Sequence, residues 1–160
     1  MEYIREWVLH GAAERQIGVR ELDEAERTRL LDDVFAKYTR GYRYSWAMWE
    51  SKFFAEHVGL RAEDGWRWCG DLVGSQEVVL FFNSSDDKAM FMVAGGDDLV
   101  NILGEMPRRE FYLTNASTDY LLCFNHHDYL IACGATREWM VNYQLSAVDG
   151  DPSAPSGPLG

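Results

Sequence analysis

The sequence predicts an α+β fold, in which one central, largely antiparallel sheet of about five or six strands carries N-terminal helices and two later helices. At 160 residues, the chain has the length of one domain. Apolar residues recur at helical spacing in its first part, and after the turn signal Glu63-Asp64-Gly65 they form short β-branched and aromatic runs. Several runs are apolar at every position, which is typical of strands with both faces covered.

Two amphipathic helices are predicted near the N-terminus. In the first, the apolar residues of segment 4–12 fall on one face. Asp23 is the expected N-cap of the second, with Glu26 as its capping-box partner. The apolar stripe of this second helix lies within residues 30–38, and Gly41 is expected to end it.

A third helix is predicted in an unusually aromatic segment, residues 42–54, with Ser45 as its N-cap. Trp66 and Trp68 follow on a predicted strand, where alternate residues share one face. Aromatic platforms of this kind can stack sugars or bases, but aromatic residues at helical spacing are more often part of a core. Both interpretations stay open, with core packing favoured.

Six segments are predicted to be strands because they are short, apolar and bounded by turn residues. They are residues 66–69, 77–83, 89–93, 111–114, 120–125 and 129–133. Residues 97–106 and 136–145 are predicted helices that can cover one face of the sheet. The N-terminal helices could cover or flank the other face. Residues 1–147 would form one globular domain, and the Pro-, Ser- and Gly-rich segment 148–160 a disordered tail.

The charge of the chain limits its partners. Fifteen Lys and Arg residues against 26 Asp and Glu residues give a net charge of −11. An acidic protein is poorly suited to bind duplex nucleic acid or an anionic membrane, since both favour basic patches. No apolar run reaches the roughly 18 residues that a membrane span needs. We therefore expect neither nucleic acid nor membrane as a partner.

The three cysteines, Cys69, Cys123 and Cys133, are odd in number and flanked by apolar residues. This pattern favours buried, reduced thiols over a disulfide framework. The N-terminal segment 1–7 carries charges where a secretory signal would need a continuous apolar stretch. Both observations predict a cytoplasmic protein.

The acidic residues are concentrated in the second half of the chain, where residues 66–160 have a net charge of −8. Asp86 and Asp87 fall in one predicted loop, and Asp97 and Asp98 at a predicted helix start. These carboxylates could simply solvate the surface, and a helix N-terminus independently favours them. Alternatively, they form a negative patch that steers a basic partner onto this half.

A polar tip separates the last two predicted strands, so we expect a β-hairpin with Asn125 opening its turn. His126, His127 and Asp128 follow, and imidazole with carboxylate suits a divalent metal or acid–base chemistry. Adjacent side chains usually point apart, and the other histidines, His10 and His57, fall on predicted helices. The alternatives are a turn whose histidines bond to the backbone, or a partner contact.

The motifs of common enzyme classes are missing: no Gly-x-Ser-x-Gly, Walker loop, dinucleotide fingerprint or His-Glu-x-x-His occurs. The sequence therefore predicts no catalytic residue, no cofactor and no metal. A metal-dependent hydrolase built on the hairpin tip is the alternative hypothesis.

One segment resembles a known class of protein. The strings Glu110-Phe111-Tyr112-Leu113, Asp119-Tyr120-Leu121-Leu122 and Asn125-His126-His127-Asp128-Tyr129-Leu130, with Gly134, look like a segment of small bacterial proteins. Some of these resemble the immunity proteins of polymorphic toxins. The resemblance covers about residues 110–134 and implies a cytoplasmic protein that blocks another protein, with no catalytic residues to carry over.

The first functional hypothesis is therefore a non-catalytic, cytoplasmic, immunity-type module that occludes a basic protein, such as a toxin. The expected partner-binding residues are Asp86, Asp87, Asp97, Asp98, Asn125, His126, His127 and Asp128. Under this hypothesis, the affinity for the partner should fall with added salt. Charge reversal at the four aspartates should slow association more than it speeds dissociation.

Overall fold

The computed structural model describes residues 3–40, 56–107 and 109–148, and for residues 144–148 the backbone alone. These residues form five helices and seven strands. The helices are α1 (Ile4–Glu14), α2 (Glu24–Tyr38), α3 (Gly65–Val73), α4 (Gly96–Glu105) and α5 (Thr136–Val148). The strands are β1 (Val19–Glu21), β2 (His57–Arg61), β3 (Val78–Phe81), β4 (Met90–Val93), β5 (Phe111–Thr114), β6 (Tyr120–Phe124) and β7 (Tyr129–Gly134).

The strands form one sheet in the order β1-β4-β3-β5-β6-β7-β2, and every neighbouring pair is antiparallel. This confirms the predicted α+β class, with one strand more than expected. The five strands predicted within residues 77–133 are all present. Their apolar composition and bounding turn residues were therefore sufficient to locate them.

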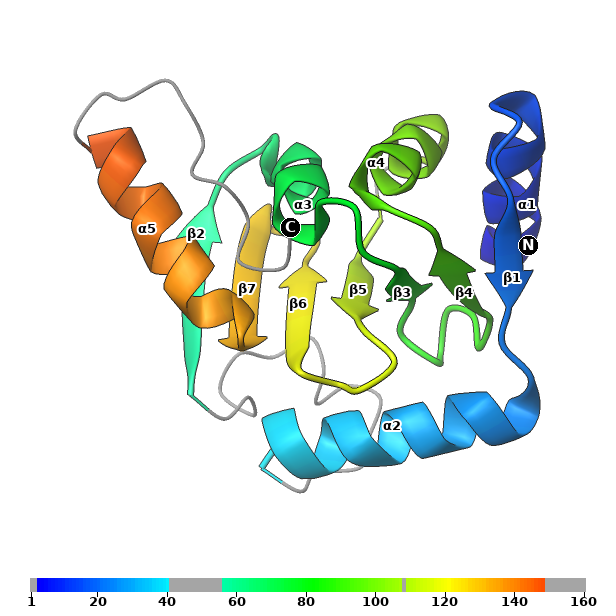
Figure 1. Cartoon of the computed structure of the whole chain (residues 1–160), viewed down its shortest axis with the longest axis horizontal. Helices are drawn as coiled ribbons and strands as arrows, with labels where there is room; N and C mark the ends of the chain where they lie inside the picture. Colours follow the sequence, from blue (N-terminus) through cyan, green and yellow to red (C-terminus); the bar gives the residue numbers. More distant parts are fainter. Residues whose placement is uncertain (1–2, 41–55, 108, 149–160) are drawn as a thin grey trace.

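Helices cover both faces of this sheet. On one face, α1, α3, α4 and α5 pack against a core that includes Leu80, Leu113 and Leu122. On the other face, α2 packs against Phe81 and Tyr112. Figure 1 shows α2 alone below the strands and running across their direction, with α3 and α4 above the strands and α5 and α1 at the two sides. As a result, β3, β5 and β6 are buried at every residue, as their continuous apolar runs predict.

Local signals placed several helices correctly. The Asp23 carboxylate accepts a hydrogen bond from the backbone N–H of Glu26, and the Glu26 carboxylate accepts one from the backbone N–H of Asp23. This is the predicted capping box at the start of α2. The helices predicted at 97–106 and 136–145 are α4 and α5.

The strand predicted at residues 66–69 is wrong, because this segment belongs to helix α3. Cys69, Leu72 and Val73 are buried at helical spacing, and that period extends past the four residues on which the strand prediction rested. Trp66 and Trp68 consequently do not share the face of a strand. Trp68 stacks on Tyr143 of α5, with ring centroids 4.4 Å apart.

Two strands, β1 and β2, were missed. Both are edge strands with exposed or half-buried residues, so neither carries a continuous apolar run. His57, expected on a helix, is the first residue of β2 and pairs with Cys133. Three predictions lie outside the described residues. They are the end of the second helix at Gly41, the third helix in the aromatic segment 42–54, and most of the disordered tail.

Helices α3 and α4 cross at two glycines. A Cβ atom on Gly96 would collide with the carbonyl group of Gly70, and its distance to the carbonyl carbon would be 2.9 Å. A Cβ on Gly70 would lie 2.7 Å from Cγ2 of Val100. Because the carbonyl is backbone, it cannot rotate away. This close crossing therefore requires Gly96, and it places the C-terminal end of α4 beside the start of α3.

We predict that Gly96→Ala lowers the free energy of unfolding by about 1–3 kcal/mol, the usual cost of forcing atoms into a packed contact. Gly104, in the last turn of the same helix, is the matched control. Its added Cβ would meet only Cη2 of Trp66, at 3.7 Å. Gly104→Ala should raise stability by about 0.5–1 kcal/mol through helix propensity. Urea unfolding measures the free energy of unfolding of both variants. Equal effects of the two substitutions would show that the helix crossing does not require glycine at position 96.

Candidate functional site

The strand register gathers loops from distant parts of the chain at one end of the sheet. Phe81 pairs with both Met90 and Tyr112, Phe111 pairs with Phe124, and Arg61 pairs with Tyr129. These pairs bring together four segments, residues 61–64, 82–89, 109–110 and 125–128, which we call the hairpin edge. This edge is where most of the predicted site residues lie.

Asn125 opens the hairpin turn, as predicted. Its side-chain oxygen accepts hydrogen bonds from the backbone N–H groups of His127 and Tyr129, at 2.9 and 3.1 Å. The side chain thereby holds the turn in shape, and Asn125 is only 8 % exposed. It shapes the tip and presents little surface of its own.

His126 and His127 are exposed at this tip, and their ring centroids are 4.0 Å apart. The expectation that adjacent side chains point apart is therefore wrong for this pair. Asp128, next in the chain, adopts a positive φ of 65°. Among the described residues, no three His, Cys, Asp or Glu side chains come together in a way that could hold a metal ion.

A buried carboxylate lies behind the tip. The Glu110 side chain is 7 % exposed, and its Oε2 accepts a hydrogen bond from the Tyr112 hydroxyl at 2.8 Å. Its Oε1 lies 3.5 Å from Nδ1 of His126. Burial raises the pKa of Glu110 above its ordinary value, while the hydrogen bonds to Tyr112 and His126 oppose part of that rise. Asp86 contributes a further, smaller increase in the pKa.

Asp86 and Asp87 both lie on the hairpin edge, but in different roles. The Asp87 carboxylate accepts hydrogen bonds from the backbone N–H groups of Arg5 and Ala89, at 3.1 and 2.9 Å. Since Tyr3 makes no side-chain cap at the start of α1, Asp87 places an anion at that helix N-terminus. Asp86 is exposed to solvent. Of the two, Asp86 is the residue presented to a partner.

Asp97 and Asp98 lie at the other end of β4, in the first turn of α4. The four aspartates therefore do not form one patch, because β4 separates the two pairs. In the first turn of a helix, carboxylates interact favourably with the helix dipole. This local role is sufficient to explain why carboxylates stand at positions 97 and 98, and it needs no contact with a partner.

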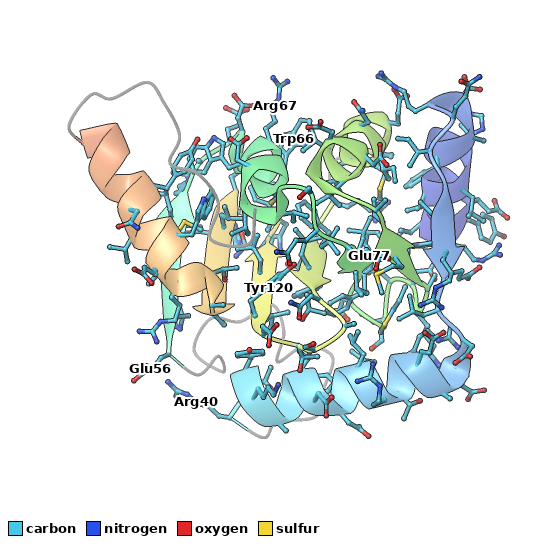
Figure 2. All side chains as sticks on the ribbon, viewed as in Figure 1. Arg40, Glu56, Trp66, Arg67, Glu77 and Tyr120 are labelled. Carbon is cyan, nitrogen blue, oxygen red and sulfur yellow. The ribbon has the colours of Figure 1, made fainter. Side chains whose placement is uncertain are left out.

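A pocket of about 230 Å³, lined by both apolar and charged side chains, opens at the hairpin edge on the face covered by α3 and α4. Its walls combine aromatic rings, other apolar side chains and charged groups. The lining residues are Glu63, Asp64, Trp66, Phe82, Leu103, Gly104, Met106, Pro107, Arg109, Phe111 and Phe124. Trp66 projects from α3 on the side of α4, while Arg67 points outward (Figure 2). The guanidinium carbon of Arg67 lies 5.1 Å from the centre of the Trp66 ring.

Sequence reasoning missed the pocket and Glu110. Glu110 stands immediately before β5, a strand that is buried at every residue. Trp66 was singled out for its aromatic side chain but was assigned to a strand. The pocket itself joins residues about 60 positions apart, and that pairing depends on the strand order, which no local pattern encodes.

Comparison of the chain with protein-family models, with curated proteins and with solved structures found no match. No helix among the described residues is long and apolar enough to cross a membrane.

The raised pKa of Glu110 predicts a specific dependence of stability on pH. The folded chain holds this proton more tightly than the unfolded chain, so stability falls as the pH rises from about 4.3 through the folded pKa. Glu110→Gln has no such proton. The difference in unfolding free energy, wild type minus variant, should therefore decrease across this window and then level off. Urea unfolding at successive pH values measures it, and a constant or rising difference would show that Glu110 is not desolvated.

Proposed function

We propose that this protein is a non-catalytic, immunity-type module of the cytoplasm that binds and occludes a basic protein through its hairpin edge. The observation that carries the proposal is the pocket, in which aromatic and other apolar side chains lie beside two carboxylates. Glu63 and Asp64 line the pocket and are exposed. Protein interfaces commonly place a desolvated apolar anchor site inside a polar rim.

The charge of the hairpin edge suits a basic partner. Its four segments contain six acidic residues and three basic ones, a net charge of −3. The acidic residues are Glu63, Asp64, Asp86, Asp87, Glu110 and Asp128. They come from four separate segments, so the fold itself assembles them. A field of this sign accelerates encounter with a cationic surface.

Two further observations support the immunity-type and cytoplasmic parts of the proposal. The segment that resembles immunity proteins forms β5, β6 and β7, and the turn between β6 and β7 lies on the hairpin edge. Cys69, Cys123 and Cys133 are free and buried. Burial raises the pKa of the Cys133 thiol to about 12, and such thiols stay protonated and reduced in a cytosol.

Affinity capture tests the proposal. The full-length protein is used as bait in the cytosol of the cells that produce it, at low salt, and bound proteins are identified by mass spectrometry as the salt is raised. We expect one basic protein to elute with increasing salt, because exposed charge pairs are screened. Elution that is independent of salt, or a captured partner that is acidic, would contradict the proposal.

Binding kinetics with the captured protein test the position of the surface. Asp86→Lys should slow association by roughly tenfold at low salt and change the dissociation rate much less, since an exposed charge acts mainly on encounter. Asp97→Lys is the matched control, because it changes the net charge equally at the other end of β4. Equal effects of the two reversals on association would show that net charge, and not the hairpin edge, attracts the partner.

A further inference from the structure

We infer that the pocket at the hairpin edge receives one aromatic side chain of the partner, flanked in the partner's sequence by Lys or Arg. This inference rests on the proposed function and deepens it, since it names what the pocket recognises.

The size of the pocket selects a single side chain. Its volume of about 230 Å³ is below the roughly 300–1,000 Å³ of sites that hold cofactors or drug-sized ligands. Interface pockets of this scale receive the anchor residues that dominate binding energy, among which Trp and Tyr are enriched. The pocket therefore fits a single large side chain better than a metabolite.

The walls select an aromatic ring. Four of the lining side chains, Trp66, Phe82, Phe111 and Phe124, are themselves aromatic. Phe111 and Phe124 already pack with ring centroids 5.7 Å apart in a tilted arrangement, so a further ring can extend the cluster edge to face. Met106 adds a thioether, which also contacts ring edges favourably.

The charged lining residues select what flanks the ring. Arg109 also lines the pocket, and its guanidinium carbon lies 5.2 Å from the centre of the Trp7 ring, a cation–π contact with α1. Glu63 and Asp64 lie together on another part of the lining, just before α3. Cationic residues beside the partner's ring would meet these two carboxylates, with Asp86 elsewhere on the same edge.

Gly104 keeps the pocket open. It lines the pocket and is exposed, and a side chain there would begin 3.7 Å from Cη2 of Trp66. Gly104→Leu would therefore place an isobutyl group in the mouth of the pocket without a backbone collision. Asn101→Leu adds a similar group to an exposed position of α4 that does not line the pocket. The two variants form a matched pair.

The test is a titration of the protein with short synthetic peptides at low salt. Binding is measured by NMR from the chemical shifts of the backbone amides. The probe is acetyl-Gly-Lys-Trp-Lys-Gly-amide. One control replaces its Trp by Ala, and a second replaces both Lys residues by Glu. We expect saturable shifts at Trp66, Gly104 and Phe111 with the probe, and at least about fivefold weaker binding of each control, the loss typical of a truncated anchor.

The variants locate the binding. Gly104→Leu should lower the affinity for the probe peptide by at least about fivefold, while Asn101→Leu should leave that affinity unchanged within about twofold. The amide spectrum of each variant without peptide establishes that it is folded. Equal binding of the Ala peptide, or probe binding by Gly104→Leu that matches Asn101→Leu, would overturn the inference.

The same variants separate this inference from the proposed function. If wild-type bait captures a salt-sensitive basic protein and Gly104→Leu bait captures it equally well, the proposed function stands and the pocket is not its anchor site. If wild-type bait captures no such protein, the proposed function fails, whatever the peptides do.

Discussion

The central strands of this sheet carry apolar side chains on both faces, and each face must therefore be covered. Helix α2 covers one face, and α1, α3, α4 and α5 cover the other. This constraint determines where function can be located, because little of the sheet surface remains for a ligand. Among the residues that the structure describes, the side chains presented to solvent come from the loops at the two ends of the strands, from the edge strands and from the outer surfaces of the helices.

The two ends of the sheet differ in what they offer. At the hairpin edge, the α3–α4 crossing at Gly70 and Gly96 brings two helix ends over the last rings of the apolar core and leaves a pocket there. Glu63 and Asp64 line it. The buried Glu110 lies on the same edge, but it accepts a hydrogen bond from Tyr112 on the face covered by α2. At the other end, Asp97 and Asp98 are accounted for by the dipole of α4. The combination of a pocket with carboxylates, more than charge alone, distinguishes the hairpin edge.

Much of the fold followed from sequence, because its signals are local. The capping box of Asp23 and the continuous apolar runs located α2 and five strands. The edge strands β1 and β2 lack such runs and were missed, since only their pairing with β4 and β7 defines them. In the same way, Asn125 was identified from its turn chemistry, whereas the approach of Trp66 to Gly104 depends on how two helices cross. Local chemistry was predictable, and tertiary proximity was not.

Hydrogen exchange with the captured partner bound tests the central claim most directly, because it reports on both ends of the sheet in one measurement. We expect backbone amides of residues 82–89 and 125–128 to gain protection in the complex, while those of residues 115–119, in the loop between β5 and β6 at the opposite end, exchange as in the free protein. Protection confined to residues 115–119, or spread equally over both ends, would contradict it.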